Sequence, residues 1–135
     1  MVIGLNQYCN GGKDPVAGAT QHCDQRSPGS AVIRAAAGHM HLLGRSIKIE
    51  LNPGTAGART LLDIPQYNFD DQSIRPLATP VRVKAGDVLR VTCTHDAGLR
   101  KLLPQLRTLP PRYVVWGDGT SDEMCLGLVI WSPQT

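Results

Sequence analysis

Aromatic residues are scarce in this chain. Its 135 residues include one Phe, two Trp and three Tyr, although 41% of the residues are hydrophobic. A core must therefore be built mainly from Val, Ile, Leu and Ala, a composition that suits short strands. The 14 basic residues, for a net charge of +3, are scattered singly and are not interleaved with aromatics. We therefore expect no nucleic-acid partner.

Long hydrophobic runs are also missing. The longest, from Leu126 to Trp131, is far short of the about 20 residues that cross a bilayer. The stretch Met1 to Leu5 is too short for the core of a signal peptide. We expect no membrane partner, and a single soluble domain of residues 1–135 in a mature or trimmed form.

The chain has four cysteines: Cys9, Cys23, Cys93 and Cys125. They include no CxxC pair and no interval typical of a zinc site. This spacing favours two disulfides over a thiolate metal cage, and hence an oxidising, extracellular or secreted location. The alternative is four buried free thiols in a cytosolic protein.

Turn residues divide the chain into short segments. Residues 1–30 are rich in Gly, Asn, Asp, Pro and Ser, so we expect an irregular segment with a local Cys9–Cys23 bridge, either a lid or a strand with a long turn. In residues 31–131, short β-branched and aliphatic runs are closed by Gly, Pro or Asp. No segment has a convincing helical periodicity. The sequence predicts an all-β protein, an antiparallel β-sandwich.

Period-two patterns locate the expected strands. The run His39–Leu51 places Leu43, Ile47, Ile49 and Leu51 on one face, which predicts a single half-buried strand. Another strand is expected at 59–63, and residues 80–83 should meet residues 88–94 across the turn 84–87. Residues 96–112, with a basic cluster, are expected to form a long surface loop. The chain closes with the runs 113–116 and 123–131.

His39 and His41 lie two residues apart on the first expected strand. Their side chains should therefore project from one side, with Cα atoms roughly 6 to 7 Å apart, so that two imidazoles can bind one ion. Imidazole suits copper, zinc, iron and nickel alike, so the pair does not identify the metal. Two histidines at this spacing are also often incidental and solvent-facing.

A polar turn, residues 120–123, leads directly to Met124 and Cys125. A thioether is a soft ligand that favours Cu(I) over Zn(II) or Mg(II). Taken alone, Met124 is more simply a core residue.

Three motifs together resemble a known family. They are HMHLLG at residues 39–44, PVRVKAGD at 80–87 leading to Cys93, and GTSDEMC at 119–125. In order and spacing they resemble the C-terminal domain of the type II copper, ascorbate-dependent monooxygenases, a family that includes peptidylglycine α-hydroxylating monooxygenase and dopamine β-monooxygenase. The resemblance covers about residues 39–131, and HxH followed tens of residues later by DEMC is specific in combination.

The resemblance implies a jelly-roll-like sandwich with one copper ion, the site of dioxygen activation. The implied ligands are His39, His41 and Met124. The resemblance also implies a disulfide between Cys93 and Cys125. Closing a loop of this length contributes roughly 3 to 4 kcal/mol in the chain-entropy model, and the bridge would fix the strand beside the methionine.

Other polar residues are candidates for supporting roles. His95, two residues beyond Cys93, could share its face and either contact a ligand imidazole or replace a ligand. Asp122 and Glu123 could accept hydrogen bonds from ligand imidazoles, although their simpler role is to satisfy N–H groups of a turn. His22 is expected to be a surface histidine.

The chain departs from the family pattern in two respects. Its four histidines are too few for the second, three-histidine copper that supplies an electron in the two-domain enzymes. The arginine, asparagine and tyrosine that bind the substrate carboxylate in the peptide hydroxylases correspond here to Ala37, Leu126 and Leu128. A glycine-extended peptide is therefore not the expected substrate.

Two functions follow from the resemblance. The one we favour is an oxygen-activating monooxygenase domain that uses copper and dioxygen to hydroxylate a C–H bond of an organic substrate. Electrons would come from ascorbate, another small reductant, or an electron-donor protein or domain. The alternative is a copper-binding protein without turnover, for copper storage, delivery or sensing, although the chain lacks the Met- or His-rich tracts that copper carriers often use. A purely structural, disulfide-stapled sandwich is a third and less favoured interpretation.

Overall fold

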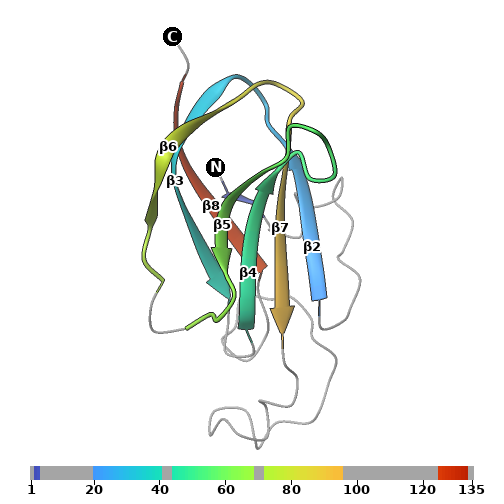
Figure 1. Ribbon diagram of the computed structural model, residues 1–135, viewed down its shortest axis with the longest axis vertical. Helices are drawn as coiled ribbons and strands as arrows, with labels where there is room; N and C mark the ends of the chain where they lie inside the picture. Colours follow the sequence, from blue (N-terminus) through green and yellow to red (C-terminus); the bar gives the residue numbers. More distant parts are fainter. Residues whose placement is uncertain (1, 4–19, 41–43, 69–71, 96–124, 134–135) are drawn as a thin grey trace, which may run out of the picture.

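The computed structural model describes residues 2–3, 20–40, 44–68, 72–95 and 125–133, and their regular structure consists of strands (Figure 1). The strands are β1 Val2–Ile3, β2 Thr20–Arg26, β3 Ala31–Met40, β4 Gly44–Leu51, β5 Arg59–Ile64, β6 Arg75–Val83, β7 Val88–His95 and β8 Cys125–Pro133. They form a sheet A in the order β1-β8-β3-β6 and a sheet B in the order β2-β7-β4-β5. The predicted all-β sandwich is confirmed. The described part of the chain contains no helix that could cross a bilayer.

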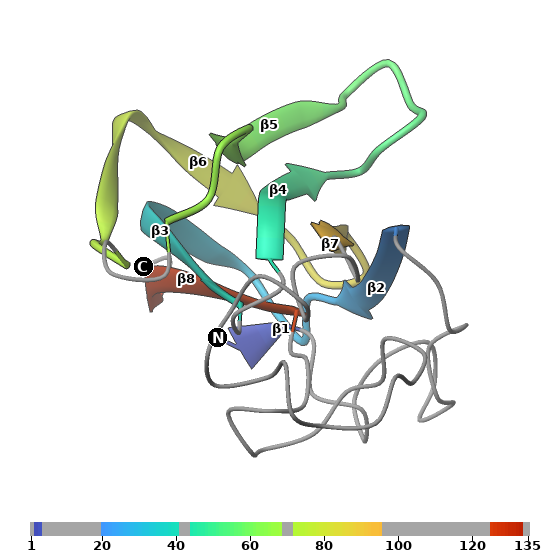
Figure 2. The ribbon, with the colours of Figure 1, turned by 90° about the horizontal axis from the view of Figure 1, so that it is seen from below.

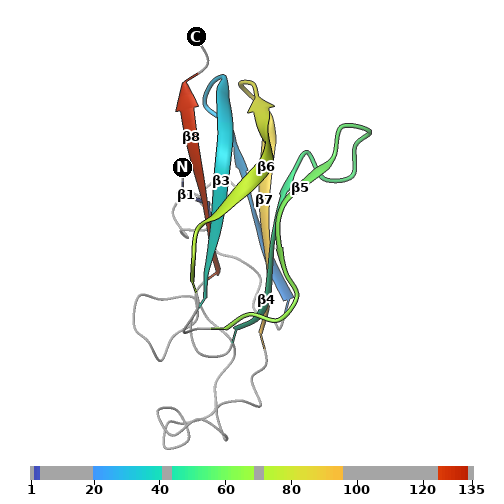
Figure 3. The same ribbon diagram turned by 60° about the vertical axis from the view of Figure 1, so that its left-hand side comes forward.

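The strand pairs are nested and antiparallel. β1 pairs with β8, β2 with β7, β3 with β6 and β4 with β5, and the β3–β8 and β4–β7 pairs complete the sheets. One long hairpin folded over into two sheets gives this nesting. The sheets appear as two layers when viewed from below (Figure 2), and β8, β3 and β6 run side by side in sheet A (Figure 3).

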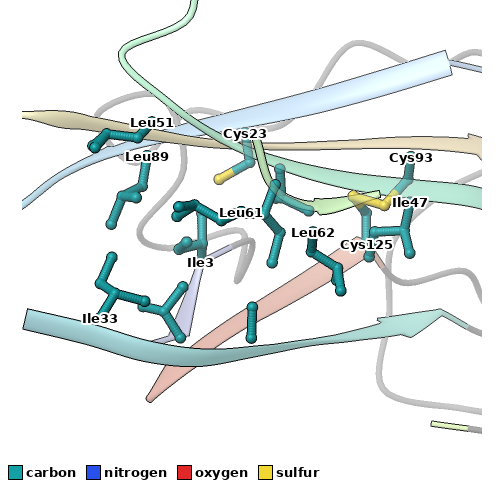
Figure 4. Close-up of a cluster of buried hydrophobic side chains, with 14 of the residues drawn as sticks. Ile3, Cys23, Ile33, Ile47, Leu51, Leu61, Leu62, Leu89, Cys93 and Cys125 are labelled. Carbon is teal, nitrogen blue, oxygen red and sulfur yellow. A yellow bond between two sulfur atoms is a disulfide. The ribbon is translucent and has the colours of Figure 1, made fainter. Parts of the chain in front are cut away.

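The core lies between the sheets and is aliphatic, as the scarcity of aromatics predicts (Figure 4). Burial alternates along the strands: in β7, every second residue from Leu89 to His95 is buried. The largest fully buried side chains are Ile3, Ile33, Met40, Ile47, Ile49, Leu89, Val91 and Val129. Complete burial of such a side chain contributes about 1.5–3 kcal/mol, which explains why a core with few aromatics suffices.

The run His39–Leu51 is not the single strand that its pattern predicts. β3 ends at Met40 in sheet A, and β4 begins at Gly44 in sheet B. Within β4 the predicted alternation is correct, since Ile47, Ile49 and Leu51 are buried. A glycine suits the start of β4 because a Cβ at Gly44 would lie 2.7 Å from the Cβ of Met40. Periodicity does not reveal such a change of sheet, because inward positions alternate in the same way in both sheets.

The predicted pairing of residues 80–83 with 88–94 is also wrong. β6 lies in sheet A and β7 in sheet B, so the turn between them crosses the sandwich. The turn itself is well formed: Lys84 N donates to Asp87 Oδ2 at 2.9 Å, and Asp87 N donates to Lys84 O at 3.1 Å. Gly86 has φ +88, which glycine adopts without steric cost. Turn residues specify a reversal of the chain, but they do not specify the neighbour of the next strand.

Part of the segment expected to be irregular is a strand. β2 lies within residues 1–30 and pairs with β7 along its whole length, so the strand alternative holds there. Cys23 is buried in β2 and is disulfide-bonded. Its expected partner, Cys9, lies outside the described residues, and their pairing stays a prediction.

The remaining strand predictions have mixed outcomes. β5 and β8 match the predicted runs 59–63 and 123–131 within the described residues. The long strand β3 was not predicted before His39, because its sequence AVIRAAAG contains four alanines and a glycine, which strands disfavour. The expected loop 96–112 and the run 113–116 lie outside the described residues.

Candidate metal centre

One end of the sandwich brings together two of the motifs singled out in the sequence. β3 and β7 end there and β4 and β8 begin there, at the lower end of Figure 1; we call it the His39 end. In the β3–β8 register, His39 is opposite Leu126 and Met40 is opposite Cys125. The described residues of the two motifs, His39, Met40 and Cys125, therefore lie on adjacent antiparallel strands. His41 and Met124 themselves lie outside the described residues.

Alternation along β3 places His39 on the outer face of sheet A. Met40 is fully buried in the core. A Cβ on Gly38 would lie 2.9 Å from the side chain of Ile47 in sheet B, so positions 38 and 40 face inward. His39 lies between them and is half-buried. Its opposite residue Leu126 is half-buried too and alternates with inward-facing Cys125 and Gly127, so both side chains share the outer face.

The ring of His39 is held by Gln72, which precedes β6. His39 Nδ1 lies 2.5 Å from Gln72 Oε1. An amide oxygen only accepts hydrogen bonds, so Gln72 Oε1 favours the tautomer with the hydrogen on Nδ1, in which the neutral ring has its lone pair on Nε2. Metal-binding histidines are commonly oriented by such a bond from the other ring nitrogen. His39 therefore fits the role of an Nε2 ligand. Gln72 could not be found from the sequence, because 33 positions separate it from His39.

A glycine pair lets the two sheets approach beside this histidine. Gly38 in β3 is opposite Gly127 in β8. A Cβ on Gly127 would lie 3.0 Å from Ile49 and 3.3 Å from Val91 in sheet B. Side chains at both positions would force the sheets apart. The glycines therefore set the depth of the core next to His39.

A disulfide links the sheets at the same end. Cys93 of β7 and Cys125 of β8 are bonded with an S–S distance of 2.07 Å and a Cα–Cα distance of 5.8 Å (Figure 4). This is the pairing that the family resemblance implies. Both cysteines are fully buried, and one of them directly follows Met124. The bond fixes the start of β8 against sheet B.

His95 lies on a different face from His39. It is 3% exposed and shares the inward face of β7 with Cys93, as predicted, so it lies between the sheets. His39 points out from sheet A. Alternation thus does not bring the two rings together, and a role for His95 as a ligand has no support from the strand faces. His22 is exposed, as expected. Asp122 and Glu123 lie outside the described residues.

Tyr67 contributes a contact to this end that the sequence did not suggest. Met40 N donates to Tyr67 Oη at 3.0 Å, and Tyr67 Oη donates to Met40 O at 3.2 Å. The tyrosine follows β5 in an irregular stretch, and no motif marks it. Its hydroxyl satisfies both main-chain groups of the residue between His39 and His41.

The described residues contain no group of three or more His, Cys, Asp or Glu side chains that could hold a metal. Of the three expected ligands, only His39 is described. Met124, the thioether ligand, belongs to none of those four residue types. The described residues also include a charge pair between β2 and β7 of sheet B. There, hydrogen bonds from Arg90 at 2.6 and 2.9 Å hold the pKa of Asp24 below its ordinary value.

Known proteins match most of this chain. Residues 15–135 match the family described as copper type II ascorbate-dependent monooxygenase, C-terminal domain. The chain is 32% identical to dopamine beta-hydroxylase of Equus caballus over 118 residues, which are 86% of this chain and 18% of that protein. Over 118 residues it is 31% identical to dopamine beta-hydroxylase of Homo sapiens, with 86% and 18% covered.

A more distant relative matches over a longer stretch. Tyramine beta-hydroxylase of Caenorhabditis briggsae is 27% identical over 138 aligned residues, covering 97% of this chain and 19% of that protein. The chain thus spans less than a fifth of the length of these relatives. Since the family match covers nearly the whole chain, this protein belongs to the C-terminal domain family of the copper type II ascorbate-dependent monooxygenases.

Proposed function

We propose that this chain binds one copper ion through His39, His41 and Met124 and forms the oxygen-activating domain of a monooxygenase. The reaction is hydroxylation of a C–H bond of an organic substrate, with electrons from ascorbate or another external donor. Copper, when bound, supplies the binding and reduction of dioxygen. The family is copper- and ascorbate-dependent, and the roles of these residues are our proposal.

The β3–β8 register carries the proposal. Met40 is opposite Cys125 in antiparallel strands. His41 follows the first of these residues and Met124 precedes the second in the sequence. Consecutive Cα atoms are 3.8 Å apart. His41 and Met124 are therefore each one residue away from main chains that lie side by side. Two imidazoles and one thioether form a donor set suited to Cu(I) and leave a coordination position for dioxygen.

The hydrogen bond between His39 and Gln72 supports the proposal independently. With Nδ1–H directed at Gln72 Oε1, the neutral tautomer of His39 has its lone pair on Nε2. Gln72 thus orients the ring and keeps one nitrogen available for the metal.

The neighbours of His39 bear on the substrate. Ala37 is opposite Leu128 and His39 is opposite Leu126 in the β3–β8 pair. Ala37 is buried, and the two leucines are half-buried. None of these three side chains can pair with a carboxylate. We therefore infer a substrate that is held beside His39 by apolar contact.

The disulfide supports an oxidising compartment. Cys93 and Cys125 are bonded to each other, and Cys23 is disulfide-bonded, so none of the described cysteines is free. Disulfides persist mainly in secreted and extracellular proteins. We infer that the protein acts outside the cytosol, where ascorbate or another donor must reach the copper.

Anaerobic titration with Cu(I) tests the metal site. Wild type should bind one equivalent, and His39→Ala and Met124→Ala should each lower the affinity at least about tenfold. His22→Ala is the matched control because His22 is exposed on β2. Oxygen uptake should then be measured with copper and ascorbate, and wild type should consume oxygen in a copper-dependent manner that His39→Ala loses.

The outcomes separate the possible functions. Failure of wild type to bind Cu(I), or equal loss in His22→Ala, would disprove the site. Tight binding with no oxygen consumption would contradict the enzymatic part of the proposal and favour copper storage, delivery or sensing.

A further inference from the structure

We propose that Tyr67 is a positioning residue for copper binding, acting through the main chain between the two histidines. This inference rests on the proposed function, because it assumes that His39 and His41 bind the metal. Tyr67 does not need to touch the metal. Its role is to fix the backbone from which both imidazoles extend.

The hydroxyl occupies the place of a strand partner at Met40. Among the described residues, β3 pairs with β6 as far as Ala36, which is opposite Arg75, whereas its pairing with β8 continues to Met40. At Met40, the amide donates to Tyr67 Oη at 3.0 Å and the carbonyl accepts from Tyr67 Oη at 3.2 Å. Main-chain groups left without partners are costly when buried. One side chain thus takes the place of the neighbouring strand.

Tyr67 is itself fixed to the other sheet. Its main-chain N–H donates to Arg45 O at 2.7 Å at the start of β4, and its half-buried ring packs against the core. Residues 41–43, which include His41, connect β3 to β4, and Met40 and Gly44 are the described residues on either side of this connection. Tyr67 therefore contacts the chain just before and just after the connection that carries His41.

The close contact of Met40 with Gly44 supports this geometry. A Cβ added at Gly44 would lie 2.7 Å from Met40 Cβ and 2.9 Å from its Sδ atom. Met40 and Gly44 thus lie close together, and Tyr67 is bonded to Met40 and to Arg45, the residue after Gly44. Loss of the hydroxyl leaves this packing in place but releases the main chain at Met40. The expected change is a less exact placement of the two imidazoles rather than loss of the fold.

The test compares Tyr67→Phe with Ser27→Ala, a hydroxyl deletion at the opposite end of the sandwich. Ser27 is 3% exposed, and its Oγ donates to Gly29 O at 2.8 Å. Tyr67→Phe should lower Cu(I) affinity about tenfold or more, the usual effect of losing support for a metal ligand. Ser27→Ala should leave the affinity unchanged, even if both variants lower the thermal midpoint. Without metal, the Met40 amide should exchange with solvent faster in Tyr67→Phe than in wild type, while the amide of Val32, at the far end of β3, should not.

The results separate this inference from the proposed function. If wild type binds no Cu(I), the proposed function fails. If wild type binds but Tyr67→Phe binds equally well, or if Ser27→Ala weakens binding as much, Tyr67 is not a positioning residue. Should Tyr67→Phe fail to fold, wild type alone remains informative: Cu(I) should slow exchange of the Met40 amide more than that of Val32, and equal slowing would overturn the inference.

Discussion

The two ends of the sandwich are held together by different means. Opposite the His39 end, turns from three places in the chain bond to one another; we call this the Asp87 end. Ser27 N donates to Asp87 O at 2.7 Å, and Asn52 Nδ2 donates to Asp87 Oδ1 at 3.2 Å. Val88 N donates to Asn52 Oδ1 at 2.8 Å. The described contacts of the His39 end instead include a disulfide between the sheets, a glycine pair and the hydroxyl of Tyr67.

The difference shows where stability and function are expected to separate. At the Asp87 end, polar turn residues satisfy each other, and no predicted ligand lies among them. At the His39 end, the contacts that stabilise the fold also fix two strands. These are β3, which carries His39 and ends just before His41, and β8, which begins just after Met124. Damage to the first end should therefore cost stability alone, whereas damage to the second should cost stability and copper affinity together.

The largest effect is expected from removing the disulfide. The double variant Cys93→Ala, Cys125→Ala should lose about 4 kcal/mol of unfolding free energy. The two cysteines are 32 residues apart, so their bond removes much conformational entropy from the unfolded chain. Copper affinity should fall as well, since the start of β8 is released from sheet B. Denaturant unfolding and Cu(I) titration below the transition measure the two effects. A loss under about 1 kcal/mol would show that the remaining contacts suffice.

A methyl group in the glycine pair should have the next largest effect. In Gly38→Ala the new Cβ would lie 2.9 Å from two carbons of Ile47, which should destabilise the protein by about 1–3 kcal/mol and weaken Cu(I) binding at the adjacent His39. Gly29→Ala is the matched control, because nothing lies within 4 Å of its added Cβ. Equal stability of the two variants would contradict the close approach of the sheets.

Removing Asn52 tests the opposite end. Asn52→Ala loses the side-chain bonds to Asp87 and Val88 and should destabilise by about 1–2 kcal/mol. Asn52 also has φ 47, so Asn52→Gly, which relieves that conformation, should be less destabilised than Asn52→Ala. Thermal melts rank the three proteins. A weaker Cu(I) affinity in either folded variant would break the proposed separation of the two ends.

The smallest effect is expected from the Asp24–Arg90 pair, which lies between the ends. Because Arg90 lowers the pKa of Asp24 in the folded protein, the pair stabilises above the unfolded pKa of about 4 and loses this effect as pH falls through the folded pKa. The side chains are 34% and 32% exposed, so the contribution should be under about 1 kcal/mol. Asp24→Asn should be less stable than wild type at pH 7 and approach it at low pH. A difference that grows on acidification would contradict this sign.

Sequence patterns predicted the positions of strands and turns better than they predicted which strands pair in a sheet. The alternation in residues 44–51 and the turn at 84–87 are as expected, because both depend on local rules of side-chain direction and backbone conformation. The assignment of residues 39–51 to one strand and the pairing of 80–83 with 88–94 were wrong. Each error came from treating chain neighbours as sheet neighbours, whereas β3 and β4, like β6 and β7, lie in opposite sheets.

The sequence by itself determined the aliphatic core, the all-β class and, through HxH and DEMC, the family. It did so because composition, period-two alternation and motif spacing are properties of the chain alone. Only the tertiary structure decided that β3 lies beside β8, that His39 faces outward while His95 faces inward, and that Gln72 contacts the ring of His39 and Tyr67 the main chain of Met40. These facts depend on which strands become neighbours, and packing between segments far apart in the chain sets that choice.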